Sequence, residues 1–123
     1  MNTQEKVIKI LMDEQYQDGS FGRFHTMDSK LKQKIPTTEA AAWLMYENFI
    51  TRQVDVCNKT CLYMERLLDG TRNWPDSWEK NKYFKSAVPL FIASKLALFT
   101  SETNEYKRVL NTWISILISA FQT

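Results

Sequence analysis

The stretch QYQDGSFGRF, residues 15–24, lies between two segments of helical periodicity and holds two of the chain's three glycines. The pair Asp18-Gly19 favours a tight turn, and Gly22 can adopt a positive φ at no steric cost. A turn between two amphipathic helices closes a helix hairpin. This stretch therefore predicts that the chain begins with such a hairpin.

The segments on both sides of the turn have the pattern of helices. From Thr3 to Tyr16, apolar residues recur at helical spacing. These residues are Val7, Ile8, Leu11 and Met12. After the turn, Thr37 is a suitable N-cap for a second helix. Glu39 in the first turn also favours this helix, which is expected to extend to about Ile50.

Three further helices are predicted in the rest of the chain. The third begins at a cap, Asp55, and ends at Gly70. One stripe of it carries Cys57, Cys61, Met64 and Leu68. The fourth covers residues 83–99 and is bent or restarted at Pro89, and the fifth covers residues 104–121. Because no segment alternates with period two for long enough to form a sheet, the fold class is all-α, with about five helices.

A weak internal repeat organises these helices. Each of two hairpins has a helix, a turn and a second helix, and the turns contain Ser20-Phe21 and Ser77-Trp78. Helix pairs that repeat in this way are typical of stacked αα-hairpins. The sequence therefore predicts stacked antiparallel hairpins within a single domain, residues 1–123.

The first turn resembles the repeat motif of a known superfamily. The chain has Leu11 and then the string Gln15-x-x-Asp18-Gly19-Ser20-Phe21. This string is similar to the repeat of the terpenoid cyclase and protein prenyltransferase superfamily, in which Gln is followed by Asp-Gly-Ser and usually by Trp. The second copy, RNWPDSWEKN at residues 72–81, retains Asp, Ser and Trp and lacks the Gln and the Gly.

The resemblance implies both a fold and a structural role. The superfamily builds an α/α toroid from helix hairpins, and its Gln ties the end of one helix to the start of another and lies against the aromatic ring. By resemblance, Gln15 and Phe21 brace the first hairpin, with Asp18 and Gly19 in its turn, and they do no chemistry. A chain of 123 residues is too short to close a toroid, so an incomplete, toroid-like array is expected.

The two reactions of this superfamily need patterns that the chain does not present. Cyclases that begin by protonation have an Asp-x-Asp-Asp run, which is absent from the sequence. Prenyltransferases hold zinc with Asp-x-Cys and a later His. Asp55-Val56-Cys57 has that spelling but lies at the wrong end of the hairpin, and the single histidine, His25, precedes it. Cys57 and Cys61 are interpreted as core residues, and no catalytic residue, metal or cofactor is expected.

Composition narrows the class of protein. With 44% hydrophobic and 24% charged residues, the chain is typical of a globular domain. Its apolar runs are shorter than the roughly 20 residues that span a bilayer. The start, MNTQEKVIKILMDE, lacks an apolar signal core. The sequence therefore predicts a cytoplasmic protein with no membrane span.

Two connections gather aromatic and basic residues. In an up-and-down array, connections 17–36 and 70–85 emerge at the same end, where eight basic side chains stand against four acidic ones. Such an excess suits an anionic ligand, whether a diphosphate, an acidic protein surface or nucleic acid. The predicted binding surface consists of Arg23, Phe24, His25, Arg72, Trp74, Trp78 and Lys82.

The fifth helix is apolar on more than one face. Soluble monomers rarely leave so large an apolar surface exposed to water. Self-association would cover this surface, most economically as a two-fold dimer. The predicted seam recurs every three or four positions and consists of Val109, Trp113, Ile116 and Ala120.

Three functions stay open at this point. The first is a non-catalytic binding or assembly module, which works through the loop end or the fifth helix. The second is a fragment or subunit of an enzyme that acts on isoprenoid diphosphates. The third is a small nucleic-acid-binding regulator, which only the basic and aromatic residues support. The residues name no ligand or pathway, and they do not tell whether the chain is part of a longer protein.

Overall fold

The computed structural model describes residues 1–24, 34–72, 92–99, 111, 114–115 and 118. The chain divides into two compact units, Met1–Tyr63 and Met64–Thr123. The described residues form helices, turns and loops with no strand among them, so the fold class is all-α, as predicted. The stacked, toroid-like arrangement and the single domain stay predictions.

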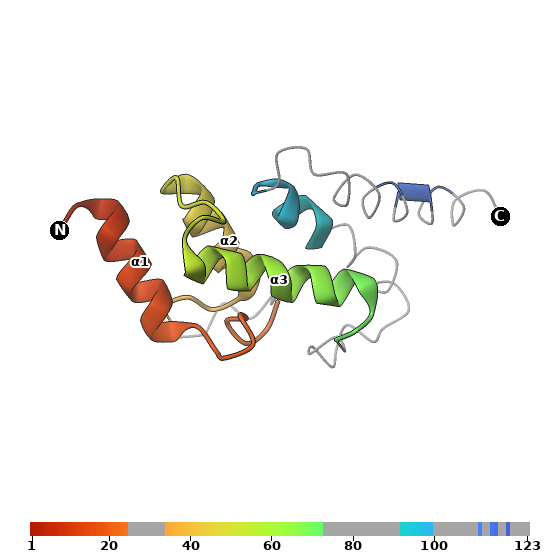
Figure 1. Cartoon of the computed structure of the whole chain (residues 1–123), viewed down its shortest axis with the longest axis horizontal. Helices are drawn as coiled ribbons and strands as arrows, with labels where there is room; N and C mark the ends of the chain where they lie inside the picture. Colours follow the sequence, from red (N-terminus) through yellow and green to blue (C-terminus); the bar gives the residue numbers. More distant parts are fainter. Residues whose placement is uncertain (25–33, 73–91, 100–110, 112–113, 116–117, 119–123) are drawn as a thin grey trace. The chain divides into compact units, whose positions relative to one another are not determined.

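The first three helices lie close to their predicted limits (Figure 1). They are α1, Thr3–Glu14; α2, Thr38–Glu47; and α3, Asp55–Asp69. Residues 92–97 are helical within the predicted fourth helix, and residues 111, 114–115 and 118 are helical within the predicted fifth. Pro89, where a bend was expected, lies outside the described residues.

Side-chain caps fix where α1 and α2 begin. The Asn2 side chain accepts a hydrogen bond from the Glu5 backbone N–H at 2.8 Å. The Thr37 hydroxyl accepts one from the Ala40 N–H at 3.0 Å, which confirms the predicted N-cap of α2. Each cap satisfies one of the backbone donors that a helix start leaves without a partner. Asp55 is already helical in α3, rather than the cap that precedes it.

The helices α1 and α2 form an antiparallel hairpin (Figure 1). At one end, the Gln4 amide donates to the carbonyl oxygens of Asn48 and Phe49, at 3.1 and 3.3 Å. At the other end, the Ile35 N–H donates to the Glu14 carboxylate at 3.1 Å. The start of α1 therefore lies beside the end of α2, and the end of α1 beside the segment that leads into α2. This confirms the hairpin that the turn motif predicts.

The turn after α1 is closed by its own backbone. The Tyr16 N–H donates to the Ser20 carbonyl at 2.9 Å, and the Gly19 N–H donates to the Tyr16 carbonyl at 3.0 Å. The Asp18 carboxylate accepts from the Ser20 N–H at 2.9 Å. Gly19 has a φ of 91°, a left-handed conformation that side chains disfavour. The residue types of the motif therefore suit the turn that they form.

The residues after the turn pack against the start of α2. The Thr38 and Glu39 N–H groups donate to the carbonyls of Arg23 and Phe24, at 2.8 and 3.0 Å. In return, the Phe21 N–H donates to the Thr38 hydroxyl at 3.0 Å, which is fully buried. The first turn of α2 is thus satisfied by the backbone of the preceding loop as well as by its cap.

The Gln15 side chain joins the end of α1 to the first turns of α3. Its amide nitrogen lies 2.8 Å from the Val56 carbonyl, 3.0 Å from the Thr60 hydroxyl and 3.3 Å from the Gly19 carbonyl. The Thr60 hydroxyl donates to the same Gly19 carbonyl at 2.9 Å. These contacts link a helix end to a helix start, the kind of role that the resemblance implies for this glutamine.

The unit Met1–Tyr63 has an apolar core to which all three helices contribute. Its largest fully buried side chains include Leu11, Phe24, Met45, Ile50 and Tyr63. Phe21 is buried too, as expected for a brace. The stripe of Cys57, Cys61, Met64 and Leu68 along α3 is buried, which confirms its prediction. Met12 was expected on the apolar face of α1 and is exposed, so that face is narrower than predicted.

Gly19 gives a test of how closely the turn approaches α3. A Cβ atom at this position would lie 2.2 Å from the Lys59 carbonyl oxygen, which no side-chain rotation can relieve. We expect Gly19→Ala to lower the free energy of unfolding by about 3 kcal/mol or more, measured by urea titration.

Gly22→Ala is the matched control. Gly22 has a similar φ of 87°, and the nearest atom to its added Cβ would be a Tyr16 ring carbon at 3.4 Å. This variant should lose only the cost of a left-handed residue, about 1–2 kcal/mol. Equal losses for the two variants would show that the close approach of Gly19 to α3 does not matter.

Phe21 gives a test of the brace. Because its ring is buried, we expect Phe21→Ala to lower the free energy of unfolding by about 3–5 kcal/mol. The exposed aromatic residue Tyr16 supplies the control, since Tyr16→Ala removes a ring that is largely in water. An unchanged urea midpoint for Phe21→Ala would refute the structural role of this residue.

Candidate interaction surface on helix α2

The structure alters the binding surface that was predicted at the loop end. Phe24 is fully buried, so its place on an exposed surface was wrong. The cause is the packing of this loop against the start of α2, where the Phe24 carbonyl accepts from the Glu39 N–H. Arg23 and Arg72 are exposed and belong to different units. The other predicted members, His25, Trp74, Trp78 and Lys82, lie outside the described residues.

The predicted seam on the fifth helix also lies outside the described residues. This holds for all of its members, Val109, Trp113, Ile116 and Ala120. In the same segment, the described residues Ile114 and Ile118 are helical and exposed. Self-association through this seam stays a prediction.

The cysteine pair of α3 belongs to the core. Cys57 and Cys61 are free thiols with no exposed surface, and the Cys57 thiol lies 3.9 Å from the Ile50 carbonyl. A hydrogen bond from Cys61 lowers the pKa of Cys57, against the opposing effect of burial, and the charge of Arg52 lowers it further. Among the described residues, no group of three or more His, Cys, Asp and Glu side chains could hold a metal ion.

Helix α2 buries one side and exposes aromatic rings on the other. Its buried residues are Thr38, Ala41, Ala42 and Met45. Trp43 and Tyr46 keep 47% and 48% of their surface exposed, and their ring centroids are 5.7 Å apart. This separation lies within the range in which aromatic rings attract one another. The two rings therefore form a half-exposed pair on the outer side of α2.

The end of α2 places a third aromatic residue in water. The Ile50 N–H donates to the Met45 carbonyl at 2.9 Å, and the Phe49 N–H donates to the Tyr46 carbonyl at 3.1 Å. These two hydrogen bonds form a Schellman motif. The motif requires a residue in the left-handed conformation just after the last turn of the helix, and that residue is usually Gly. Here that residue is Phe49, with a φ of 59° and 84% of its surface exposed.

We refer to Trp43, Tyr46 and Phe49 together as the aromatic surface. They follow one another at intervals of three residues along α2 and its end. Exposed aromatic residues are enriched at the centres of protein interfaces, where they supply a large contact area at low entropic cost. Phe49 therefore places a large exposed side chain at a left-handed position where Gly or Asn is usual.

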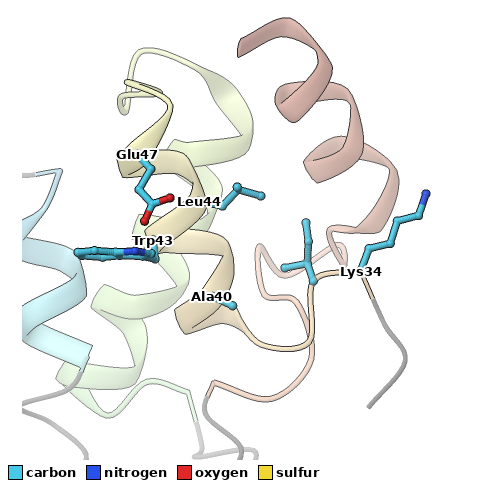
Figure 2. A pocket seen from close by; sticks show the side chains of 6 residues that line it. Lys34, Ala40, Trp43, Leu44 and Glu47 are labelled. Carbon is cyan, nitrogen blue, oxygen red and sulfur yellow. The ribbon is translucent and has the colours of Figure 1, made fainter. Parts of the chain in front are cut away.

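A pocket of about 240 Å³ lies beside the aromatic surface (Figure 2). Its lining is Lys34, Ile35, Ala40, Trp43, Leu44 and Glu47. Figure 2 shows Glu47 and Trp43 on one side of the pocket and Lys34 on the other, with Leu44 pointing between them. The pocket thus has an apolar centre, with the acidic residue Glu47 at one side and Lys34 at the other, and the Lys34 amino group points outward, away from Leu44.

Sequence reasoning missed this surface, although the sequence contains a signal for it. Trp43, Leu44, Met45 and Tyr46 are four consecutive apolar residues. One face of an amphipathic helix cannot bury four consecutive residues, because successive side chains point about 100° apart. At least one large side chain of this run had to be exposed or to contact something else.

No family model, curated protein or solved structure matched the chain. The resemblance to the terpenoid cyclase and prenyltransferase superfamily therefore rests on the motif residues alone. No helix in the part of the chain that the structure describes has the length and hydropathy needed to cross a membrane.

A substitution of Phe49 tests whether its ring contributes to the stability of the fold. We expect Phe49→Asn to raise the free energy of unfolding by about 1 kcal/mol, because Asn tolerates this conformation and the exposed ring contributes little packing. The measurement is urea unfolding, with Tyr46→Asn as a control that should give no gain. A loss of stability in Phe49→Asn would show that the ring is held for the fold.

Proposed function

We propose that the chain is a non-catalytic binding or assembly module that contacts a protein partner through the aromatic surface of α2. The observation that carries this proposal is Phe49, a large apolar side chain that is 84% exposed at a left-handed position. An asparagine or glycine there would cost less in folding and would leave less apolar surface in water. A contact with another molecule explains why a phenylalanine stands there.

The geometry of the surface favours a protein partner over a small molecule. The interval from Trp43 to Phe49 is six residues, or about 9 Å along a helix. The rings project from a helix and its end, and they are not gathered inside an enclosed cavity. Such a row of exposed rings, with the pocket of Lys34 and Glu47 beside Trp43, has the form of a site for a helix or a folded surface.

Photocrosslinking inside cells tests the proposal. Tyr46 is replaced with a photoreactive phenylalanine analogue, and the full chain is irradiated in the cells that express it. We expect adducts of discrete mass from position 46, because a partner that covers the aromatic surface lies within reach of this residue. Adding Trp43→Ala and Phe49→Asn should remove most of the adduct, since aromatic residues carry much of the energy of such contacts.

Tyr16 is the matched control position, because it is an exposed tyrosine of comparable accessibility outside α2. The same analogue at position 16 should give no discrete adduct. Equal adducts from positions 16 and 46, or none from position 46, would contradict the proposal. The mass of the adduct also distinguishes a second copy of the chain from a different protein.

A further inference from the structure

The pocket on α2 has opposite charges at its two sides, and both charged groups are exposed. Lys34 and Glu47 lie on opposite sides of it, with Leu44 between them (Figure 2). Among the described residues, neither charge has an ion-pair partner. An apolar strip with one cation and one anion at its sides has a defined polarity, and it selects the direction in which a partner can lie.

This arrangement of charges is complementary to itself. A two-fold rotation about an axis near Leu44 exchanges the sides of the strip, so that Lys34 of one copy meets Glu47 of the second copy, and the reverse. A two-fold interface always pairs residues in this reciprocal way. Two copies packed in parallel would instead bring like charges together, which is unfavourable.

The size and chemistry of the strip also suit a second copy of α2. Ala40, Leu44 and Glu47 share one face of the helix over two turns, which is about 10 Å. A facing helix of the same length covers this strip. Lys34 of the second copy would then approach both the Glu47 carboxylate and the Trp43 ring, and a cation over an indole face is attracted by it.

We propose that two copies of this chain associate through antiparallel packing of their α2 helices, with reciprocal pairs of Lys34 and Glu47 that flank an apolar centre at Ala40 and Leu44. This inference goes beyond the proposed function, because the interface uses the strip beside the aromatic surface and its occupant is a second copy of the chain. The contact area of a single helix face is small, so the dimer is weak and dissociates in the micromolar range or above.

Charge reversal tests the reciprocal pairing. The full chain and its variants are compared by sedimentation from about 5 to 500 µM at low and high salt. Lys34→Glu and Glu47→Lys should each weaken dimerisation about tenfold or more, because every dimer then contains two like-charged pairs. The double variant should restore the dissociation constant to within about threefold of the original value, because the pairs are regenerated with their signs exchanged.

Lys9→Glu is the matched control for net charge. Lys9 is an exposed residue of α1, and its reversal changes the net charge of the chain by the same amount as Lys34→Glu. This variant should dimerise like the original chain. Thermal unfolding of each variant shows that the fold is retained, which exposed positions favour.

A monomer at every concentration, or a double variant no stronger than the single ones, would overturn the inference. Dimerisation lost in Ile116→Glu and unaffected by the charge reversals would also overturn it, in favour of the seam on the fifth helix. Each of these results leaves the proposed function standing if position 46 crosslinks to a different protein. A chain that neither dimerises nor crosslinks would contradict both.

Discussion

The side-chain amide of Gln15 is the group that joins α1, the turn after it and the start of α3. It lies at the end of α1, and it donates toward Val56 and Thr60 in α3 and toward the Gly19 carbonyl in the intervening turn. Every acceptor around it is an oxygen, so the position requires a donor, and a glutamate of the same shape would place a carboxylate against carbonyl groups. Because Thr60 is fully buried, these hydrogen bonds lie where polar groups cannot turn to water.

A separate set of hydrogen bonds holds α2 at both of its ends. The backbone of residues 21–24 satisfies its first turn, and the Gln4 amide binds the carbonyls that follow its last turn. Between these anchors, one side of α2 packs into the core while Trp43 and Tyr46 keep half of their surface outside. The proposed interaction surface would thus be held by fixed backbone, and a surface built on an anchored helix loses little entropy when it binds.

The features that the sequence predicted well depend on local chemistry. The Asp18-Gly19 turn and the Thr37 cap are determined by a few neighbouring residues, so the pattern identified both. The burial of Phe24 and the exposure of Met12 depend on which elements pack together, and the predictions for these two residues were wrong. The left-handed Phe49 could not be predicted, because Gly or Asn is the usual sign of such a helix end. The run of apolar residues at Trp43–Tyr46 did indicate an exposed ring on α2, but only the packing of the helix shows which side chains are exposed.

Exposed aromatic rings alone would let α2 bind apolar surfaces without specificity for one partner. Trp43 and Tyr46 provide contact area for any apolar partner, and nothing in the rings chooses a direction. In the proposed dimer, the charges of Lys34 and Glu47 would supply that choice, because a partner with the wrong polarity would bring like charges together beside an apolar centre. Under this proposal, discrimination between partners would come from the orientation that the charges exclude, while the neighbouring rings would supply contact area for any partner that binds there.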